Sequence, residues 1–94
     1  MNHKLKQIIK HYGVLPQLKY FQSEIFELNE AIITCEEAYH DKAPIVEEIA
    51  DVMVMLKQFQ LYYGIEDIEI QRVMEFKVDR QLKRIAESEE HLIV

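Results

Sequence analysis

The sequence predicts an all-α fold, in which two long antiparallel helices belong to a helical bundle completed by oligomerisation. Three observations lead to this fold class. The 94 residues include only two glycines and two prolines, fewer turn-forming residues than a β-rich domain of this size needs. Apolar residues recur at alternating three- and four-residue spacing, as on the buried face of a helix. The 49% of hydrophobic and 30% of charged residues are typical of a globular chain.

Two helices are expected before residue 40. A short one covers residues 4–12 and ends before Gly13. Pro16 suits the first turn of a second helix, which nothing interrupts before Tyr39. The predicted apolar seam of this second helix is Leu18, Phe21, Ile25, Leu28, Ile32, Cys35 and Tyr39.

Two further helices are expected after a loop over residues 40–44. The third begins at Pro44 and ends near Tyr63, before Gly64. The fourth covers about 67–88, followed by a frayed tail from about 88, and residues 1–94 form a single domain. The predicted seam of the third helix is Ile45, Ile49, Val52, Leu56, Phe59 and Tyr63. The predicted buried positions of the fourth are Ile70, Val73, Met74, Val78, Leu82 and Ile85.

The third helix is apolar well beyond its seam. Its additional apolar residues are Val46, Ala50, Met53, Val54 and Met55. A helix that is apolar nearly all round is covered on several sides, and so short a chain has little surface with which to cover it. We therefore expect a homodimer or a dimer-of-dimers tetramer, with the third helix near the interface.

Composition excludes several classes of function. The net charge of −6 disfavours a general nucleic-acid binder, because such binding depends on phosphate neutralisation. The single cysteine, Cys35, excludes an intramolecular disulfide and favours a reducing cytoplasm. No run of about 18 apolar residues predicts a membrane span, and the first residues lack the apolar core of a signal peptide.

Four carboxylates form two matched pairs on the second and third helices. Glu24 and Glu27 are three residues apart, as are Glu48 and Asp51, so each pair shares one helix face. The first acid of each pair immediately precedes a seam residue, which gives both pairs the same offset from their seams. Because a short loop makes the two helices antiparallel neighbours, the four carboxylates should converge at the edge of the core.

A converging acidic cluster predicts a metal site. No Lys or Arg lies three or four residues from any of these acids to neutralise it. Four close carboxylates repel one another unless a cation is bound or some are protonated. Oxygen ligands favour a hard cation, so Mg²⁺ is the first choice and Mn²⁺ the second. The structural alternative is that both pairs are ordinary solvated helix surface.

The same segments resemble a known family. The stretches "SEIFELNEAI" and "EEIADV" carry the acidic pairs and are similar to the ExxE…ExxD motifs of MazG-type nucleoside triphosphate pyrophosphohydrolases, the all-α NTP pyrophosphatase group. The flanking "YGVLPQ" and "KVDRQLKRI" resemble elements of small members. The resemblance extends from about Tyr12 to Ile85.

The resemblance implies a Mg²⁺-dependent hydrolase that cleaves a nucleoside triphosphate between the α and β phosphates, as nucleotide-pool sanitation. The metal ligands would be Glu24, Glu27, Glu48 and Asp51, and either one of these acids or Glu47 would orient the attacking water. Two alternatives of other classes stay open. One is a non-catalytic helical dimerisation or regulatory module, and the other is a protein that binds nucleotide without turnover.

Basic and amide side chains are the predicted substrate contacts. Lys77, Arg80 and Arg84 share one side of the fourth helix, with Gln81 beside them where the family often has Asn. They are either phosphate contacts or a solvated face paired with acids of the same helix. Gln17, two turns before the first acidic pair, resembles a polar position of small family members.

Overall fold

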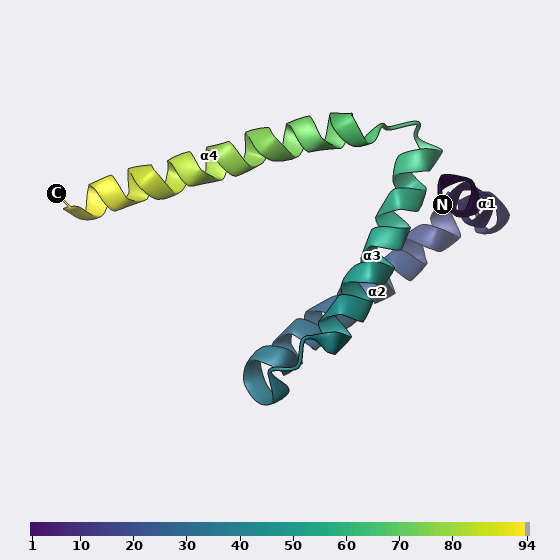
Figure 1. Cartoon of the computed structure of the whole chain (residues 1–94), viewed down its shortest axis with the longest axis horizontal. Coiled ribbons are helices and arrows are strands. Elements are labelled where there is room, and N and C mark those ends of the chain that lie inside the picture. The colour runs from purple at the N-terminus through teal and green to yellow at the C-terminus, as the bar shows by residue number, and fades with distance from the viewer. Residues whose placement is uncertain (94) are drawn as a thin grey trace. The chain divides into compact units, whose positions relative to one another are not determined.

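The computed structural model describes the backbone of residues 1–93 and the side chains of residues 1–38 and 40–89, and all its regular structure is helical (Figure 1). The α-helices are α1 (Asn2–Tyr12), α2 (Val14–Thr34), α3 (Ala43–Tyr62) and α4 (Asp67–Ile93). A π-helix, η1 (Cys35–Tyr39), directly continues α2. No strand occurs within the described backbone, which confirms the all-α class.

The chain divides into two compact units. The first is Met1–Gly64 and contains α1, α2, η1 and α3, whereas the second is Ile65–Val94 and contains α4. Every described side chain of α4 is exposed, so this helix has no core of its own. A helix buries its apolar face only against another element, and the second unit contains no other element.

Residues with positive φ mark the helix boundaries. Gly13, with φ of 88°, separates α1 from α2, and Gly64, with φ of 68°, follows α3. Glycine adopts this region without the steric cost of a Cβ atom. The second helix begins before Pro16, at Val14. A proline in the first turn is tolerated because the first N–H groups of a helix have no intrahelical acceptor.

The connection between α2 and α3 is shorter than expected. His40, in the left-handed conformation, donates its backbone N–H to the carbonyl oxygen of Cys35 at 2.9 Å and closes η1. Asp41 Oδ1 accepts the backbone N–H of Ala43 at 3.0 Å, so α3 already starts there and Pro44 lies inside its first turn. The short turn keeps α2 and α3 as antiparallel neighbours (Figure 1).

Helix α4 continues past Ser88 to Ile93. We expected it to end near Ser88, with a frayed tail after it. No glycine or proline follows Gly64, however, and without such a residue the backbone has no local reason to leave the helical conformation.

The core of the first unit lies where α1 packs against α3 and α2. Its buried apolar side chains among the described residues are Leu5, Ile9, Val52 and Met55. Phe21 of α2 and Phe59 of α3 meet edge to face, with ring centroids 5.6 Å apart. The small size of this core leaves much apolar surface uncovered.

The faces that pack between α2 and α3 include positions one residue before those we predicted. Leu18 and Ile32 are 42% exposed, and Leu56 is 50% exposed. Ile49 and Tyr63 are exposed as well, and the side chain of Tyr39 lies outside the described residues. The other predicted seam positions are shielded, namely Phe21, Ile25, Leu28 and Cys35 on α2 and Ile45, Val52 and Phe59 on α3. Shielded positions that we did not predict include Gln17, Glu24 and Ala31 on α2 and Glu48, Met55 and Gln58 on α3. An apolar period fits more than one face when a helix is apolar on several sides, so periodicity could not single out the packed face.

The six side chains that we expected α4 to bury are all exposed. They are Ile70, Val73, Met74, Val78, Leu82 and Ile85. Their burial requires a partner surface, which the lone helix of the second unit does not contain. Among the described residues, no helix has both the length and the hydropathy needed to cross a lipid bilayer.

Candidate metal centre

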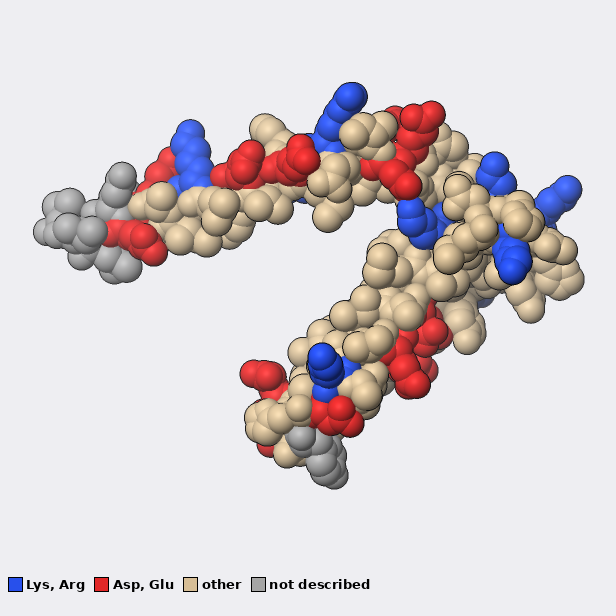
Figure 2. Space-filling model, in the orientation of Figure 1, with Lys and Arg blue, Asp and Glu red and all other residues tan. Residues whose placement is uncertain are grey.

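Three carboxylates converge between α2 and α3. Glu24, Glu27 and Glu48 each offer one oxygen, and these oxygens all lie within 4.8 Å of one another. Glu24 and Glu27 are neighbours on α2 because they are three residues apart, and the antiparallel hairpin brings Glu48 opposite them. Figure 2 shows acidic side chains gathered part of the way along this hairpin. We call Glu24, Glu27 and Glu48 the acidic centre.

Two oxygens of the acidic centre are buried without a hydrogen-bond partner. They are Oε2 of Glu24 and Oε2 of Glu48. Glu24 as a whole is only 6% exposed, so water has little access to this carboxylate. Burying a carboxylate oxygen without a partner is costly, and a bound cation is one way to remove that cost. The donor set, three carboxylates and no nitrogen or sulfur, fits a hard divalent cation.

Burial and neighbouring negative charges raise the pKa values of two carboxyls of the acidic centre, Glu24 and Glu48. Burial raises the pKa of Glu24 above its ordinary value, and the negative charges of Glu27, Asp51 and Glu48 raise it further, while the interaction with the Tyr20 hydroxyl opposes them. Burial also raises the pKa of Glu48, as do the charges of Glu27 and Asp51. An interaction with the neighbouring Glu27 carboxyl acts on the pKa of Glu48 in the same direction. Without a cation, Glu24 and Glu48 therefore retain their protons to a higher pH than isolated carboxyls do.

Asp51 and Glu47 lie beside this centre and not within it. Both are exposed, and neither belongs to the three carboxylates within 4.8 Å. Asp51 is close enough for its charge to raise the pKa of Glu24 and Glu48, and Glu47 adds to the effect on Glu48. Glu24 and Glu48 are shielded from solvent because they lie on the packed faces of α2 and α3. Glu27 and Asp51 lie one turn further along each helix and are exposed.

Gln17 is part of the core of the first unit. It is buried, and its Nε2 donates to Oε1 of Gln58 at 2.8 Å. Gln58 is 1% exposed and in turn donates to the carbonyl oxygen of Val54 at 3.4 Å. This buried amide pair ties α2 to α3 two turns from Glu24. The nucleotide contact expected of Gln17 stays a prediction.

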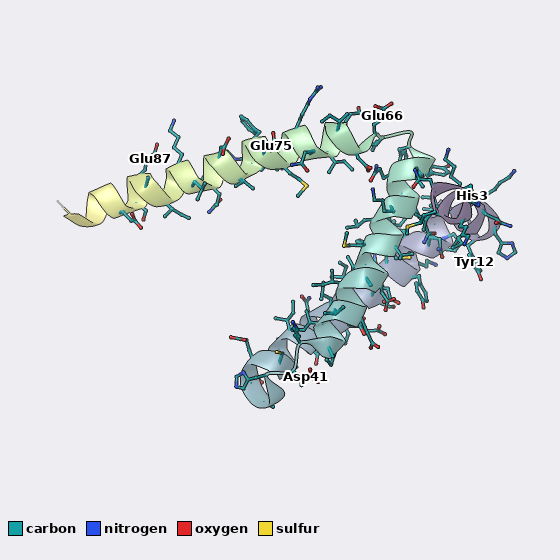
Figure 3. The ribbon with its side chains drawn as sticks, viewed as in Figure 1. His3, Tyr12, Asp41, Glu66, Glu75 and Glu87 are labelled. Atoms are coloured by element: carbon teal, nitrogen blue, oxygen red, sulfur yellow. The ribbon has the colours of Figure 1, made fainter. Side chains whose placement is uncertain are left out.

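The basic residues predicted to contact substrate lie in the second unit. Lys77, Arg80 and Arg84 are all exposed on α4. The guanidinium carbon of Arg80 is 5.8 Å from the centre of the Phe76 ring. Figure 3 marks Glu75 and Glu87 on the same helix, and Glu75 accepts a bond from Gln71 at 3.1 Å.

Tyr20 is a residue of the site that sequence reasoning missed. Its hydroxyl lies near the carboxylate of Glu24, one turn later on α2, and the interaction raises the pKa of Tyr20 and lowers that of Glu24. The available signal was spacing, since residues four apart on a helix are neighbours. The sequence-based prediction considered only Lys and Arg at these positions.

The fold and the site together define a class, an all-helical protein with a carboxylate centre between two antiparallel helices. Comparison with known proteins does not assign the chain to a family within this class. No protein-family model, no curated protein and no solved structure matches the chain.

The raised pKa values predict how the stability of the metal-free protein depends on pH. Glu24 and Glu48 ionise less readily in the folded than in the unfolded chain, whose carboxyls keep the ordinary value near 4.5. Below the unfolded pKa both carboxyls are protonated in the folded and the unfolded chain, so they do not lower the unfolding free energy. As the pH rises through their folded pKa values, the cost of burying their charges lowers the unfolding free energy, so stability is lost as the pH increases. The variant Glu24→Gln removes one ionising group and should escape part of this loss.

The measurement is urea denaturation in EDTA at a series of pH values from the ordinary carboxyl value to neutrality. The unfolding free energy of Glu24→Gln minus that of the wild type should increase with pH. Carboxyls that do not interact with Glu24 titrate alike in the two proteins and cancel in this difference. Glu48 is coupled to Glu24, and the loss of the Glu24 charge changes its contribution in the same direction. A difference that shrinks with pH would contradict the raised pKa of Glu24.

Proposed function

We propose that this protein is a Mg²⁺-dependent nucleoside triphosphate pyrophosphohydrolase, which hydrolyses its substrate between the α and β phosphates to a nucleoside monophosphate and pyrophosphate. Mn²⁺ is the alternative cation. The observation that carries the proposal is the pair of buried, unpartnered oxygens of Glu24 and Glu48, two members of an acidic centre that consists of carboxylates alone. The resemblance of both acidic motifs to MazG-type enzymes supplies the reaction.

In this proposal the acidic centre and Asp51 hold the cation. A bound Mg²⁺ would neutralise phosphate charge and lower the pKa of a coordinated water. Glu24 and Glu48, whose pKa values are raised, would bind the cation as ionised carboxylates, so cation binding and proton release are coupled there. Exposed Glu47 and Asp51 lie at the solvent side, where a carboxylate can accept the proton of the attacking water.

We assign the phosphate contacts to Lys77 and Arg80, with Arg84 as a third candidate. A triphosphate carries several negative charges, and cationic side chains attract such charge. These three residues are exposed and share one side of α4. Their guanidinium and ammonium groups are suited to phosphate oxygens.

We also propose that a second copy of the chain covers an apolar face of the hairpin, as a homodimer or as half of a dimer-of-dimers tetramer. Exposed apolar side chains follow the packed residues of α2 and α3 by one position, and in an antiparallel pair such positions fall on one side. They include Leu18, Ile32, Ile49, Met53 and Leu56. Light scattering after gel filtration should give a dimer or a tetramer, and a monomer at every concentration would refute this part.

The enzymatic proposal is tested by a pyrophosphate-release assay on the purified protein, with a panel of ribo- and deoxyribonucleoside triphosphates and with Mg²⁺ or EDTA. At least one triphosphate should release pyrophosphate only when the cation is present. If the cation raises the melting temperature but no triphosphate is hydrolysed, the protein binds without turnover. If the cation changes neither quantity, the acidic centre is not a metal site.

A further inference from the structure

The core between α2 and α3 contains two hydrogen-bonded amide side chains, Gln17 and Gln58, which we call the amide pair. Gln17 is 8% exposed and Gln58 is 1% exposed. The Nε2 atom of Gln17 donates to Oε1 of Gln58 at 2.8 Å. The Nε2 atom of Gln58 donates to the carbonyl oxygen of Val54 at 3.4 Å and lies 3.7 Å from the sulfur of Met55. The amide pair is therefore a buried, directional bond between α2 and α3.

Apolar contacts alone leave the sliding of α2 along α3 weakly determined. Such contacts are non-directional, and both helices carry apolar residues on several sides, among them Phe26 and Ile33 on α2 and Val46 and Met53 on α3. The hydrogen bond is more exacting, because its donor nitrogen and acceptor oxygen must lie about 2.7–3.2 Å apart. Sliding by one residue moves a helix by about 1.5 Å, which breaks the bond and leaves buried amide atoms without partners, at a cost in free energy.

The acidic centre depends on the same register. Glu24 follows Gln17 by seven residues, and Glu48 precedes Gln58 by ten. In an antiparallel hairpin both directions lead from the amide pair toward the connecting turn. Because Mg²⁺ accepts ligands at about 2.0–2.1 Å, a slip of one helical turn, about 5.4 Å, would take Glu48 out of reach of a cation held by Glu24 and Glu27.

We propose that the amide pair fixes the register of α2 against α3 and so holds Glu48 opposite the two ligands of α2. Gln17 and Gln58 are then positioning residues of the metal centre, and this inference rests on the proposed function. A polar group within an apolar helix contact specifies register in coiled coils. Residues that orient metal ligands without touching the metal typically change its affinity about 10–100-fold when they are mutated.

The test replaces both amides in the full chain, as the double variant Gln17→Met and Gln58→Met. Methionine is unbranched and close in length to glutamine, so it fills similar space without forming the amide bond. The matched control is Gln22→Met, at an exposed position of the same helix. Calorimetric titration with MgCl₂ alone measures the Mg²⁺ affinity. In the metal-free protein, the nuclear Overhauser effect between the rings of Phe21 and Phe59, whose centroids are 5.6 Å apart, reports on the register.

We expect the double variant to remain folded, because removing both partners leaves no buried amide unsatisfied. It should lose the Overhauser effect between the two rings and bind Mg²⁺ at least about 10-fold more weakly than the wild type. Gln22→Met should match the wild type in both measurements. An amide pair that only stabilised the fold would leave both quantities unchanged in the folded double variant.

The remaining outcomes separate the inference from the metal centre. If the double variant keeps either the Overhauser effect or the Mg²⁺ affinity of the wild type, the inference is wrong while the metal centre stands. If the wild type binds no Mg²⁺, the proposed function fails, and loss or persistence of the Overhauser effect still supports or refutes the register. If the double variant does not fold, Gln58→Met alone provides the same test, because the remaining amide, Gln17, is the less buried of the two.

Discussion

Replacing Glu48 by Gln should lower Mg²⁺-dependent pyrophosphate release about 1,000-fold. Glu48 provides one of the two buried unpartnered oxygens and is the ligand from α3 that lies opposite Glu24 and Glu27. A bound metal contributes several kcal/mol of transition-state stabilisation, and each 1.36 kcal/mol corresponds to a factor of ten in rate. The amide keeps the shape of the side chain but removes its charge, so the loss reports on the cation and not on packing.

The same substitution should have the opposite effect on the metal-free protein. Glutamine carries no charge that must be buried, so Glu48→Gln should unfold at a higher temperature than the wild type in EDTA and gain less from added Mg²⁺. The control is Glu36→Gln, an exposed acid in η1 outside the acidic centre, which should leave activity and the Mg²⁺ response unchanged. A Glu48→Gln protein with full activity would exclude Glu48 as a ligand.

Replacing Met55 by Ala should reduce the unfolding free energy by about 2–5 kcal/mol, the range for truncating a large buried side chain. Met55 is 4% exposed and lies in the core beside Val52 and Gln58. For so small a core, this loss is a large part of the total stability. Urea denaturation followed by circular dichroism measures it directly.

Met53→Ala is the matched comparison for Met55→Ala. Met53 is on the same helix but is 55% exposed, on the apolar face that we assign to a second copy. Its truncation should affect stability only through association, so its effect should vanish on dilution, whereas the loss in Met55→Ala persists at every concentration. If both variants lose the same unfolding free energy in the most dilute samples, Met55 does not lie on the packed face of α3.

The acidic centre illustrates how far sequence reasoning reached. The spacing of two acidic pairs and a short interhelical connection predicted that four carboxylates converge. Glu24, Glu27 and Glu48 have oxygens within 4.8 Å of one another, whereas Asp51, the fourth, lies beside them. Their burial was not predicted, because we placed Glu24 and Glu48 on the flank of the packed faces. The burial of Gln58 was not predicted either, because the predicted seam position is the next residue, Phe59. Gln58 is the only described residue whose side chain is less than 2% exposed.

The sequence by itself determined the helical class and the approximate helix boundaries. Glycine, proline and the apolar period act through local backbone geometry, which a short window of sequence contains. Tertiary structure decided which of several apolar faces packs, because that choice depends on how α1, α2 and α3 fit together in space. It also decided which acids are desolvated, as for Glu24 and not Asp51, since burial is a property of the packed hairpin and not of residue spacing.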